Sequence, residues 1–372
     1  TGPTPTPTPT PSPTPTGPTP TPSPTPTGPT PTPSSTPGAP STLYIDAATG
    51  SDAVTRDQAS SPSTPWRTIA HAVSQSVPGD TLLVAPGDYA ESGPLTLLQD
   101  GVSLIGLGDD VSDVRVSVTS SVDVLRIKAA GVHVENLWLD GGKRGVIALK
   151  GSNGLALVGL AVTRPSAEGV MIEVSDDVSI ESCIVTGAGS TGIATRRAKR
   201  LQIRDTDVYG NLASGLFIRK ADAELSFLTV HANGGRGIRS LAAILHLHDS
   251  ILSGNGGAAL FVRGGKPVNA HHLLFWGNDT DVNDATPPMI GTPMPGRVDA
   301  DPLFVDADGP DGILGGAGWA DDDLSLSQAP GQTETSPAVD VGSDSVATLG
   351  VTGSTNSNGA ADVGVADLGA HR

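Results

Sequence analysis

An interval of 22 to 24 residues recurs along the middle of the chain and constrains its fold more than any other feature. Gly145, Gly169, Gly192, Gly215, Gly237 and Ala259 open similar alternating segments, among them "GVMIEV" and "GLFIR", at steps of 24, 23, 23, 22 and 22 residues. Asn211, Asn233, Asn255 and Asn278 keep steps of 22, 22 and 23. This period, with short strands and no helix in each repeat, predicts a coil whose turns stack as parallel strands. The leucine-asparagine consensus of leucine-rich repeats, which have a similar period, is absent.

Alternation within each turn assigns the two faces of its strands. Two rows of mostly apolar residues lie two positions apart and are predicted to point inward. They are Val170, Ile193, Leu216, Ile238 and Leu260, and then Ile172, Thr195, Ile218, Ser240 and Val262. A second strand in each turn ("VSIESCIV", "LQIRDTDV", "ELSFLTV", "LHLHDSIL") repeats the pattern and puts Cys183 inward as a packing residue.

Residues 1–42 differ from everything that follows. They are almost wholly Thr, Pro, Ser and Gly, and the first charged residue of the chain is Asp46. Such a tract has no apolar core and is predicted to be disordered or extended like polyproline, as a tail or linker whose hydroxyls are plausible O-glycan sites.

The rest of the chain divides into three predicted parts. In residues 43–80, an N-terminal cap, "PWRTIAHAVSQS" has Ile69, Ala70 and Val73 at helical spacing and predicts one short helix. The stacked repeats occupy residues 81–298. Residues 299–372 form a closing segment with an Asp-rich loop.

Charge and composition exclude some functions. The 372-residue chain has a net charge of -17 and few aromatic residues, which disfavours a nucleic-acid partner and limits polyanion binding to a local basic patch. No apolar run approaches the roughly 18 residues of a membrane span. Cys183 is the single cysteine, so no internal disulfide is possible.

The repeat resembles a known class of proteins. Its "(V/L)x(I/L)xxxx(V/L)xGN...G(I/L)" pattern is similar to that of the right-handed parallel β-helix proteins of the pectate-lyase-like superfamily, bacterial secreted type. "STPWRTIAHAVSQSVPGDTLLVAPGDY" looks like their N-terminal cap, and "DADPLFVDADGPDGI", "SPAVDVGS" and "ADLGAHR" resemble their closing segment. The resemblance covers about residues 43–372 and implies an all-β right-handed parallel β-helix, or solenoid. It does not fix the function, because this fold hosts lyases, hydrolases, adhesins and fibres.

The resemblance also implies a structural role for the repeated asparagines. Asn211, Asn233, Asn255 and Asn278 would stack their side chains into a hydrogen-bonded ladder. Contact with a ligand is the alternative.

Outward positions are where binding or catalysis would have to occur. Glu173, Arg196, Arg219 and Arg263 are predicted to share one outward row, and Met171, Phe217, Arg239 and Phe261 the neighbouring one. In lyases of the resembled class the corresponding strand often lines the substrate cleft. Arginines there would hold uronate carboxylates while Phe217 or Phe261 stacks on a sugar. The alternative is a solvated face on which arginines cover apolar surface.

The catalytic patterns of the resembled class are incomplete here. Its lyases use an Arg or Lys base beside carboxylates that hold calcium, and its galacturonan hydrolases carry a Gly-His-Gly that this chain lacks. If the chain is an enzyme, we expect a lyase with Arg196 or Arg219 as base or carboxylate clamp and Glu173 as neighbour.

Two clusters are candidate metal sites. Asp306, Asp308 and Asp311 in "DADGPDG" resemble an aspartate-rich calcium loop, with "DDD" at 321–323 nearby, and a solvated acidic loop is the alternative. His246, His248 and His271 are predicted to approach one another across two turns, either as a metal site or as surface histidines.

Three functions are compatible with these observations. The first is a secreted or cell-surface structural or adhesive rod that assembles with copies of itself into an extracellular filament or sheath, with the Thr/Pro tail as connector. The second is a lyase or hydrolase of acidic polysaccharide. The third is a glycan-binding module without turnover.

Overall fold

The computed structural model describes residues 1–4, 38–118, 121–264, 266, 268–285, 290, 293–329 and 332–371. The chain divides into two units, Thr1–Gly38 and Ala39–Arg372. The second unit therefore begins four residues before the boundary predicted at Leu43. Residues 5–37, which hold most of the predicted tail, lie outside the described residues.

One strand from each turn of the second unit joins a nine-stranded parallel sheet. Its strands are β4 (Leu95–Leu97), β7 (Leu125–Ile127), β10 (Val146–Ala148), β13 (Val170–Glu173), β16 (Ile193–Arg196), β18 (Leu216–Arg219), β20 (Ile238–Leu241), β22 (Ala258–Arg263) and β24 (Thr280–Asp284). The two predicted inward rows are at most 2% exposed throughout, which confirms the faces assigned by alternation.

The remaining strands of each turn form a sixteen-stranded sheet, here called the bent sheet. One row of it is β1 (Thr42–Ile45), β2 (Thr81–Val84), β5 (Ser103–Gly106), β8 (His133–Glu135), β11 (Ala156–Val158) and β14 (Ser179–Glu181). The other is β3 (Gly87–Glu91), β6 (Val114–Val118), β9 (Trp138–Asp140), β12 (Ala161–Thr163) and β15 (Ile184–Thr186), and the short β25 (Val298–Asp299) pairs with β23.

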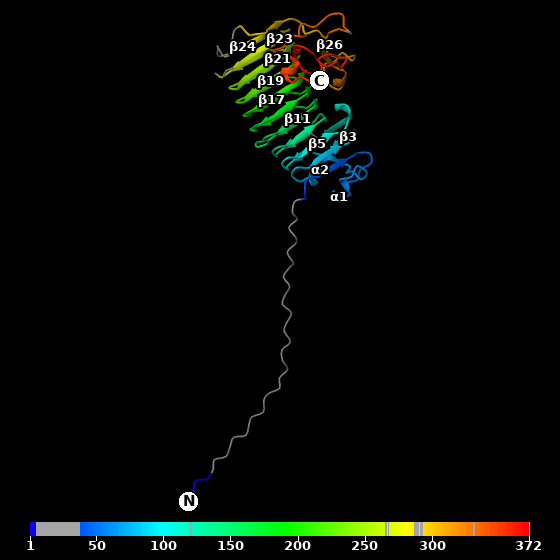
Figure 1. The fold of residues 1–372 in the computed structure, drawn as a ribbon, viewed down its shortest axis with the longest axis vertical. Coiled ribbons are helices and arrows are strands. Elements are labelled where there is room, and N and C mark those ends of the chain that lie inside the picture. The colour runs from blue at the N-terminus through cyan, green and yellow to red at the C-terminus, as the bar shows by residue number, and fades with distance from the viewer. Residues whose placement is uncertain are drawn as a thin grey trace. The chain divides into compact units, whose positions relative to one another are not determined.

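In the later turns the two rows join into single long strands. These are β17 (Leu201–Tyr209), β19 (Asp222–His231), β21 (Ile244–Ser253) and β23 (Val268–Trp276). Figure 1 shows β5, β11, β17, β19, β21 and β23 stacked one above another. The second strand predicted in each turn is therefore continuous in β17, β19 and β21, whereas the predicted strand "VSIESCIV" is split into β14 and β15.

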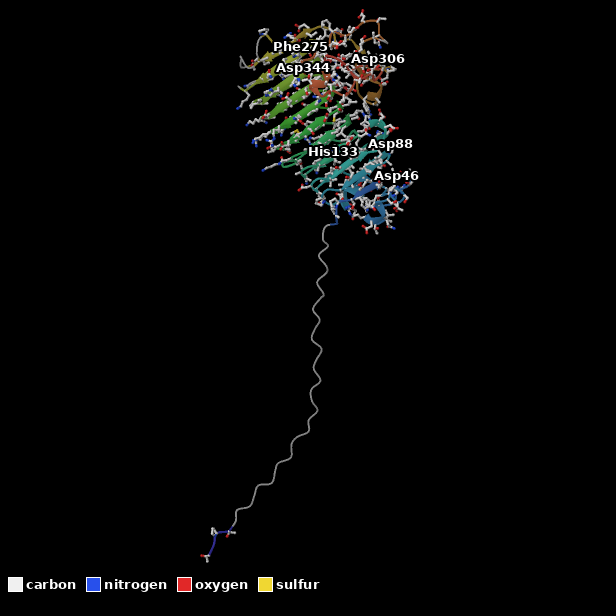
Figure 2. The ribbon with its side chains drawn as sticks, in the orientation of Figure 1. Asp46, Asp88, His133, Phe275, Asp306 and Asp344 are labelled. Carbon is white, nitrogen blue, oxygen red and sulfur yellow. The ribbon has the colours of Figure 1, made fainter. Side chains whose placement is uncertain are left out.

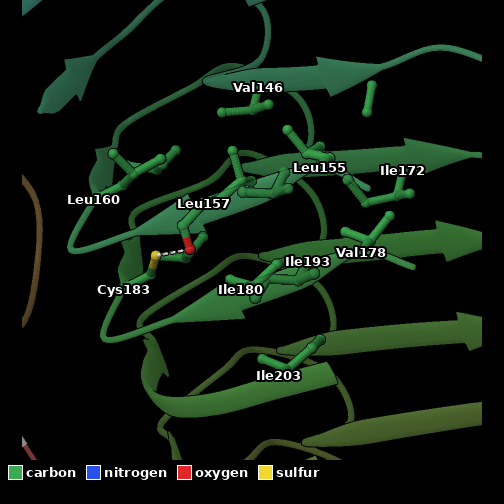
Figure 3. Packing of buried hydrophobic residues seen from close by; sticks show 14 of the residues in the cluster. Val146, Leu155, Leu157, Leu160, Ile172, Val178, Ile180, Cys183, Ile193 and Ile203 are labelled. Carbon is green, nitrogen blue, oxygen red and sulfur yellow. Dashed lines mark hydrogen bonds between the residues drawn. The ribbon is translucent and has the colours of Figure 1, made fainter. Parts of the chain in front are cut away.

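A continuous apolar core fills the stack from Leu43 to Ile290. Figure 3 shows part of it, in which Cys183 lies among Leu157, Leu160 and Ile180. The Cys183 thiol is 2% exposed, and its Sγ lies 3.6 Å from the Leu157 carbonyl oxygen. Cys183 is thus a packing residue, as predicted.

Two short helices lie at the N-terminal end of the second unit. Helix α2 (Ile69–Gln75), predicted from Ile69, Ala70 and Val73, buries Ile69, Ala72 and Val73, whereas Ala70 is exposed. A second short helix, α1 (Arg56–Ala59), was not predicted; its Arg56 makes two hydrogen bonds of 2.6 Å to the buried Asp80 carboxylate. No helix in the described part of the chain has both the length and the apolar character that a membrane span needs.

The C-terminal segment returns along the bent sheet. It contains the antiparallel pair β26 (Phe304–Asp306) and β27 (Asp323–Leu326), helix α3 (Val346–Leu349) and the 3-10 turn η2 (Trp319–Asp321); another 3-10 turn, η1 (Val111–Asp113), precedes β6. Buried contacts with Ile251, Leu274 and Tyr209 fasten the segment to the solenoid. Figure 2 shows its Asp306 and Asp344 at the same end of the unit as Phe275 of β23.

Candidate functional site

The outer face of the nine-stranded sheet carries the predicted charged row. Glu173 pairs in register with Arg196, and Arg196 with Arg219. The next residue in this row is Leu241, which separates Arg219 from Arg263. Arg263 therefore lies two strands away from Arg219 and apart from the other three.

Backbone geometry adds a second row of cations beside the first. The residues that follow β13, β16 and β18 are Val174, Arg197 and Lys220, whose φ values are 49°, 59° and 53°. A left-handed residue turns the chain at the strand end and breaks the alternation. Arg197 and Lys220 are consequently exposed, like Arg196 and Arg219 before them.

These two rows enclose a hollow of about 290 Å³, here called the basic hollow. Its lining residues are Lys150, Glu173, Val174, Arg196, Arg197, Arg219 and Lys220. Five cations thus surround one carboxylate. The Glu173 carboxylate lies 3.5 Å from the Arg196 guanidinium, and both side chains are a third or more exposed, so their pairing stabilises the fold by at most about 1 kcal/mol.

The neighbouring outward row differs from the predicted sugar-binding strip. Met171 is only 3% exposed and packs with Ile147 and Ala194. Phe217 packs against the same cluster on one side, and the Arg239 guanidinium lies 4.7 Å from its ring centroid. Because both sides of the Phe217 ring are occupied, stacking of a sugar on it would require Arg239 to move.

The Phe261 ring is also covered by a cation. Arg236, which the sequence did not single out, lies 4.3 Å from the Phe261 ring centroid. Burial, together with the nearby charges of Arg236 and Arg263, lowers the pKa of Arg239. The Arg239 and Arg236 guanidinium groups are therefore packed against the Phe217 and Phe261 rings, whereas the cations of the basic hollow are exposed.

The four repeated asparagines form one continuous hydrogen-bonded column. Asn211, Asn233 and Asn255 each donate from Nδ2 to Oδ1 of the next asparagine, at 2.9, 3.0 and 2.9 Å, ending at Asn278. Each Oδ1 that accepts such a bond also accepts the backbone N–H of the preceding asparagine. Asn211, Asn233 and Asn255 are 1% exposed, so their side chains face the interior.

The three histidines do not form the predicted metal site. Both ring nitrogens of His248 are taken, by Glu224 at 2.9 Å and by Asp249 at 2.7 Å. His271 stacks on His248 with ring centroids 5.2 Å apart, while His246 is exposed in register with Asn269. Burial lowers the pKa of His248, but its contacts with Asp249 and Glu224 outweigh this effect and raise that pKa above the ordinary value.

The Asp-rich loop does not gather its three predicted ligands. Asp311 Oδ1 accepts the backbone N–H of Ile313 at 2.8 Å, and its other oxygen lies beside Asp321 over Gly318. Within the described residues, no group of three His, Cys, Asp or Glu side chains is placed to hold a metal ion. Calcium binding by Asp306, Asp308 and Asp311 stays a prediction, which a melting temperature raised by millimolar calcium over EDTA would support and an unchanged one would oppose.

Comparisons with known proteins identify the fold. A family model described as "Right handed beta helix region" matches residues 144–284. The structure is similar to that of pectate lyase Pel9A, with a TM-score of 0.51 and 13% identity over 89% of this chain and 97% of the lyase. It also resembles the periplasmic alginate epimerase AlgG, with a TM-score of 0.45 and 14% identity; the alignment covers 59% of this chain and 60% of the epimerase.

A tailspike protein, Dettilon gp208, is similar with a TM-score of 0.43 and 14% identity over 68% of this chain and 65% of the tailspike. No curated protein matches the chain by sequence. The stacked parallel strands, the matched repeat region and the lyase structure together show that the chain has the right-handed parallel β-helix fold of pectate-lyase-like proteins.

Proposed function

We propose that the chain binds an acidic polysaccharide in the basic hollow, as an adhesive protein without turnover. The observation that carries the proposal is the gathering of five cations around one hollow in a chain whose net charge is -17. Scattered surface cations would give no such local excess. A concave site lined by one sign of charge raises the local concentration of ions of the opposite sign.

The spacing of the cations suits a polymer. Parallel strands lie ~4.8 Å apart, so Arg196 and Arg219 present guanidinium groups at that interval along the stack. A guanidinium pairs with a carboxylate through two parallel hydrogen bonds. A chain of uronate units would engage several cations at once, and each additional contact would lengthen its residence on the surface.

Similarity to pectate lyase Pel9A agrees with this substrate class, because pectate is an acidic polysaccharide. Binding should be measured by affinity electrophoresis and calorimetry with polygalacturonate and alginate. We expect the Arg196→Ala/Arg219→Ala double variant to weaken binding at least about tenfold, which corresponds to about 1.4 kcal/mol. Equal binding by this variant and the wild type would refute the proposal.

A lyase reaction in the same hollow is the second candidate function. The Glu173 carboxylate beside the Arg196 guanidinium, at 3.5 Å, is the observation in its favour. Glu173 is the one carboxylate among the lining residues, so the hollow lacks the carboxylate cluster that would hold calcium in a lyase. If the chain releases unsaturated products from pectate or alginate, and the Arg196→Ala and Arg219→Ala variants do not, the chain is a lyase and not only a binding protein.

A cell-surface or extracellular location follows from this ligand class and from the Thr/Pro-rich composition of residues 1–42. We also propose that residues 1–42 connect copies of the chain in a filament. Deletion of these residues tests the connector role. Long polymers formed by the truncated protein would oppose it, and a full-length protein that stays monomeric at high concentration would exclude the filament.

A further inference from the structure

Seven successive turns of the bent sheet, from the turn of β8 onward, each contain a left-handed residue, and these residues form a column along the solenoid. Their φ values lie between 47° and 57°. The column consists of Asn136, Gly159, Ser182, Asp205, Phe227, Asp249 and His272. At its later members the C-terminal segment packs directly: the His371 ring lies 5.0 Å from the Phe227 ring, and Ser343 donates two hydrogen bonds to Asp249.

Over the earlier members of the column a cavity of about 500 Å³ remains, here called the kink cavity. Its floor runs from Asn136 through Gly159 and Ser182 to Asp205. Asp110, the Trp319–Asp322 stretch, Gly350–Gly353 and His371 supply the walls. The floor spans three strand steps, or about 14 Å, and the volume falls within the range of natural ligand sites.

Polar atoms around the kink cavity lack partners. Trp319 is 4% exposed, and within the described part of the chain its indole Nε1 has no acceptor. One carboxylate oxygen of Asp322 also has no hydrogen bond there. Both atoms are themselves buried, so each is a cost to the fold and not a contact that the cavity offers to a ligand.

The charge of the lining selects against anions. Asp110, Glu181, Asp205 and Asp322 line the kink cavity, and the Asp205–His371 pair adds one imidazolium. Burial raises the pKa of Asp322 to about 6, while Asp205 and Asp362 hold the pKa of His371 up, at about 9. At neutral pH the lining therefore has a net negative charge.

We propose that the kink cavity binds a saccharide without acidic groups, whose hydroxyls donate to the carboxylates of Asp110 and Glu181. Trp319 and the apolar side chains of Val111, Leu160 and Ile184 face the sugar carbons. An amino sugar gains a further attraction from the same charges. This site is independent of the basic hollow.

The column itself supplies a variant that fills the cavity. A Cβ on Gly159 would meet no atom closer than 4.0 Å, and its φ of 57° is close to the 53° of Phe227 in the same column. Gly159→Phe therefore places a ring on the cavity floor in a conformation that phenylalanine already adopts in this protein. Gly141→Phe is the matched control, because Gly141 also has a left-handed φ of 72°, has open space around it and does not line the cavity.

The test is calorimetric titration of the full chain with cellohexaose, a glucosamine hexamer and hexagalacturonate. We expect cellohexaose or the glucosamine hexamer to bind, and Gly159→Phe to weaken that binding at least about tenfold while Gly141→Phe leaves it unchanged. Hexagalacturonate binding should be insensitive to both. The proposal is overturned if neither non-acidic hexamer binds, if the two phenylalanine variants behave alike, or if Gly159→Phe abolishes hexagalacturonate binding.

A second variant protects the test against misfolding of Gly159→Phe. Glu181 is exposed, and Asp110 caps η1 through a side-chain oxygen that asparagine also has. Asp110→Asn/Glu181→Gln keeps the shape of the cavity and removes two of its charges. We expect this variant to weaken binding of the glucosamine hexamer severalfold, and unchanged binding would contradict the role of these carboxylates.

Discussion

The outer face of the nine-stranded sheet and the outer face of the bent sheet differ in charge and in cover. The first is open around the basic hollow and lined by five cations. The second is packed against the C-terminal segment. The kink cavity, which lies between the bent sheet and that segment, is lined by four acidic side chains. Both faces belong to the same stack of turns, so the backbone repeat alone does not decide what a face binds. The outward side chains and the cover decide it.

The asparagine column supports both faces, and its removal should have the largest effect. Asn233→Ala leaves the backbone N–H and Nδ2 of Asn211 without their shared acceptor inside the core. We expect the free energy of unfolding in urea to fall by about 3 kcal/mol. Asn269→Ala, at an exposed position of β23, is the control and should change it by less than about 0.5 kcal/mol. Equal effects of the two substitutions would refute the structural role of the column.

The cover over the bent sheet should weaken at alkaline pH. His371 is 2% exposed, and Asp205 and Asp362 raise its pKa to about 9. The folded-state pKa of His371 lies above the unfolded value of about 6.5. The contribution of His371 to the free energy of unfolding is therefore fully present below pH 6.5 and is lost as the pH rises through 9. We expect a loss of roughly 2 to 3 kcal/mol across this interval in urea unfolding. His371→Gln should remove that pH dependence, and an identical alkaline profile in the variant would contradict the assignment.

His231 gives the opposite dependence at acid pH. It is partly buried beside Ser253 and against the Phe304 ring of the C-terminal segment, and this burial lowers its pKa to about 4. A depressed pKa means that stability is present above pH 6.5 and is lost as the pH falls toward 4. We expect the free energy of unfolding in urea to fall by about 2 kcal/mol in this range. His231→Gln should make the free energy of unfolding nearly independent of pH between 6.5 and 4. If it does not, another group controls the loss of stability at acid pH.

Charge reversal tests the open face with a smaller expected effect. Lys220→Glu adds a carboxylate to the basic hollow and should weaken polygalacturonate binding about tenfold at low salt. Lys199→Glu makes the same change of net charge at an exposed residue outside the hollow. If both variants lose the same affinity, net charge and not the hollow determines binding.

The smallest effect is expected at Cys183, which lies between the two faces in the core. Burial raises the pKa of its thiol to about 12, so almost no thiolate forms at neutral pH. We expect no reaction of the native protein with a thiol reagent, and full reaction in urea. Rapid labelling of the native protein would show that the core opens.

Much of the interior could be predicted from the sequence because the same positions are buried in each successive turn of the solenoid. The inward rows that begin at Val170 and Ile172, and the position of Cys183, follow from alternation within a period of 22 to 24 residues. Local periodicity carries this information, since each turn contacts mainly its neighbours.

The candidate sites were only partly predictable. Arg196 and Arg219 followed from alternation, but Arg197 and Lys220 did not, because a left-handed residue at the strand end reverses the expected face. The cover of Phe261 by Arg236 depends on a loop conformation. The kink cavity depends on contacts between residues more than 100 positions apart, such as Ala370 with Thr229, which no local pattern contains.

A crystal structure of the chain with an oligogalacturonate bound would test the central claim most directly. We predict that the carboxylates of the ligand lie within hydrogen-bonding distance of the Arg196 and Arg219 guanidinium groups, above the nine-stranded sheet. An oligogalacturonate found in the kink cavity, or a basic hollow that stays empty at saturating ligand, would contradict the account.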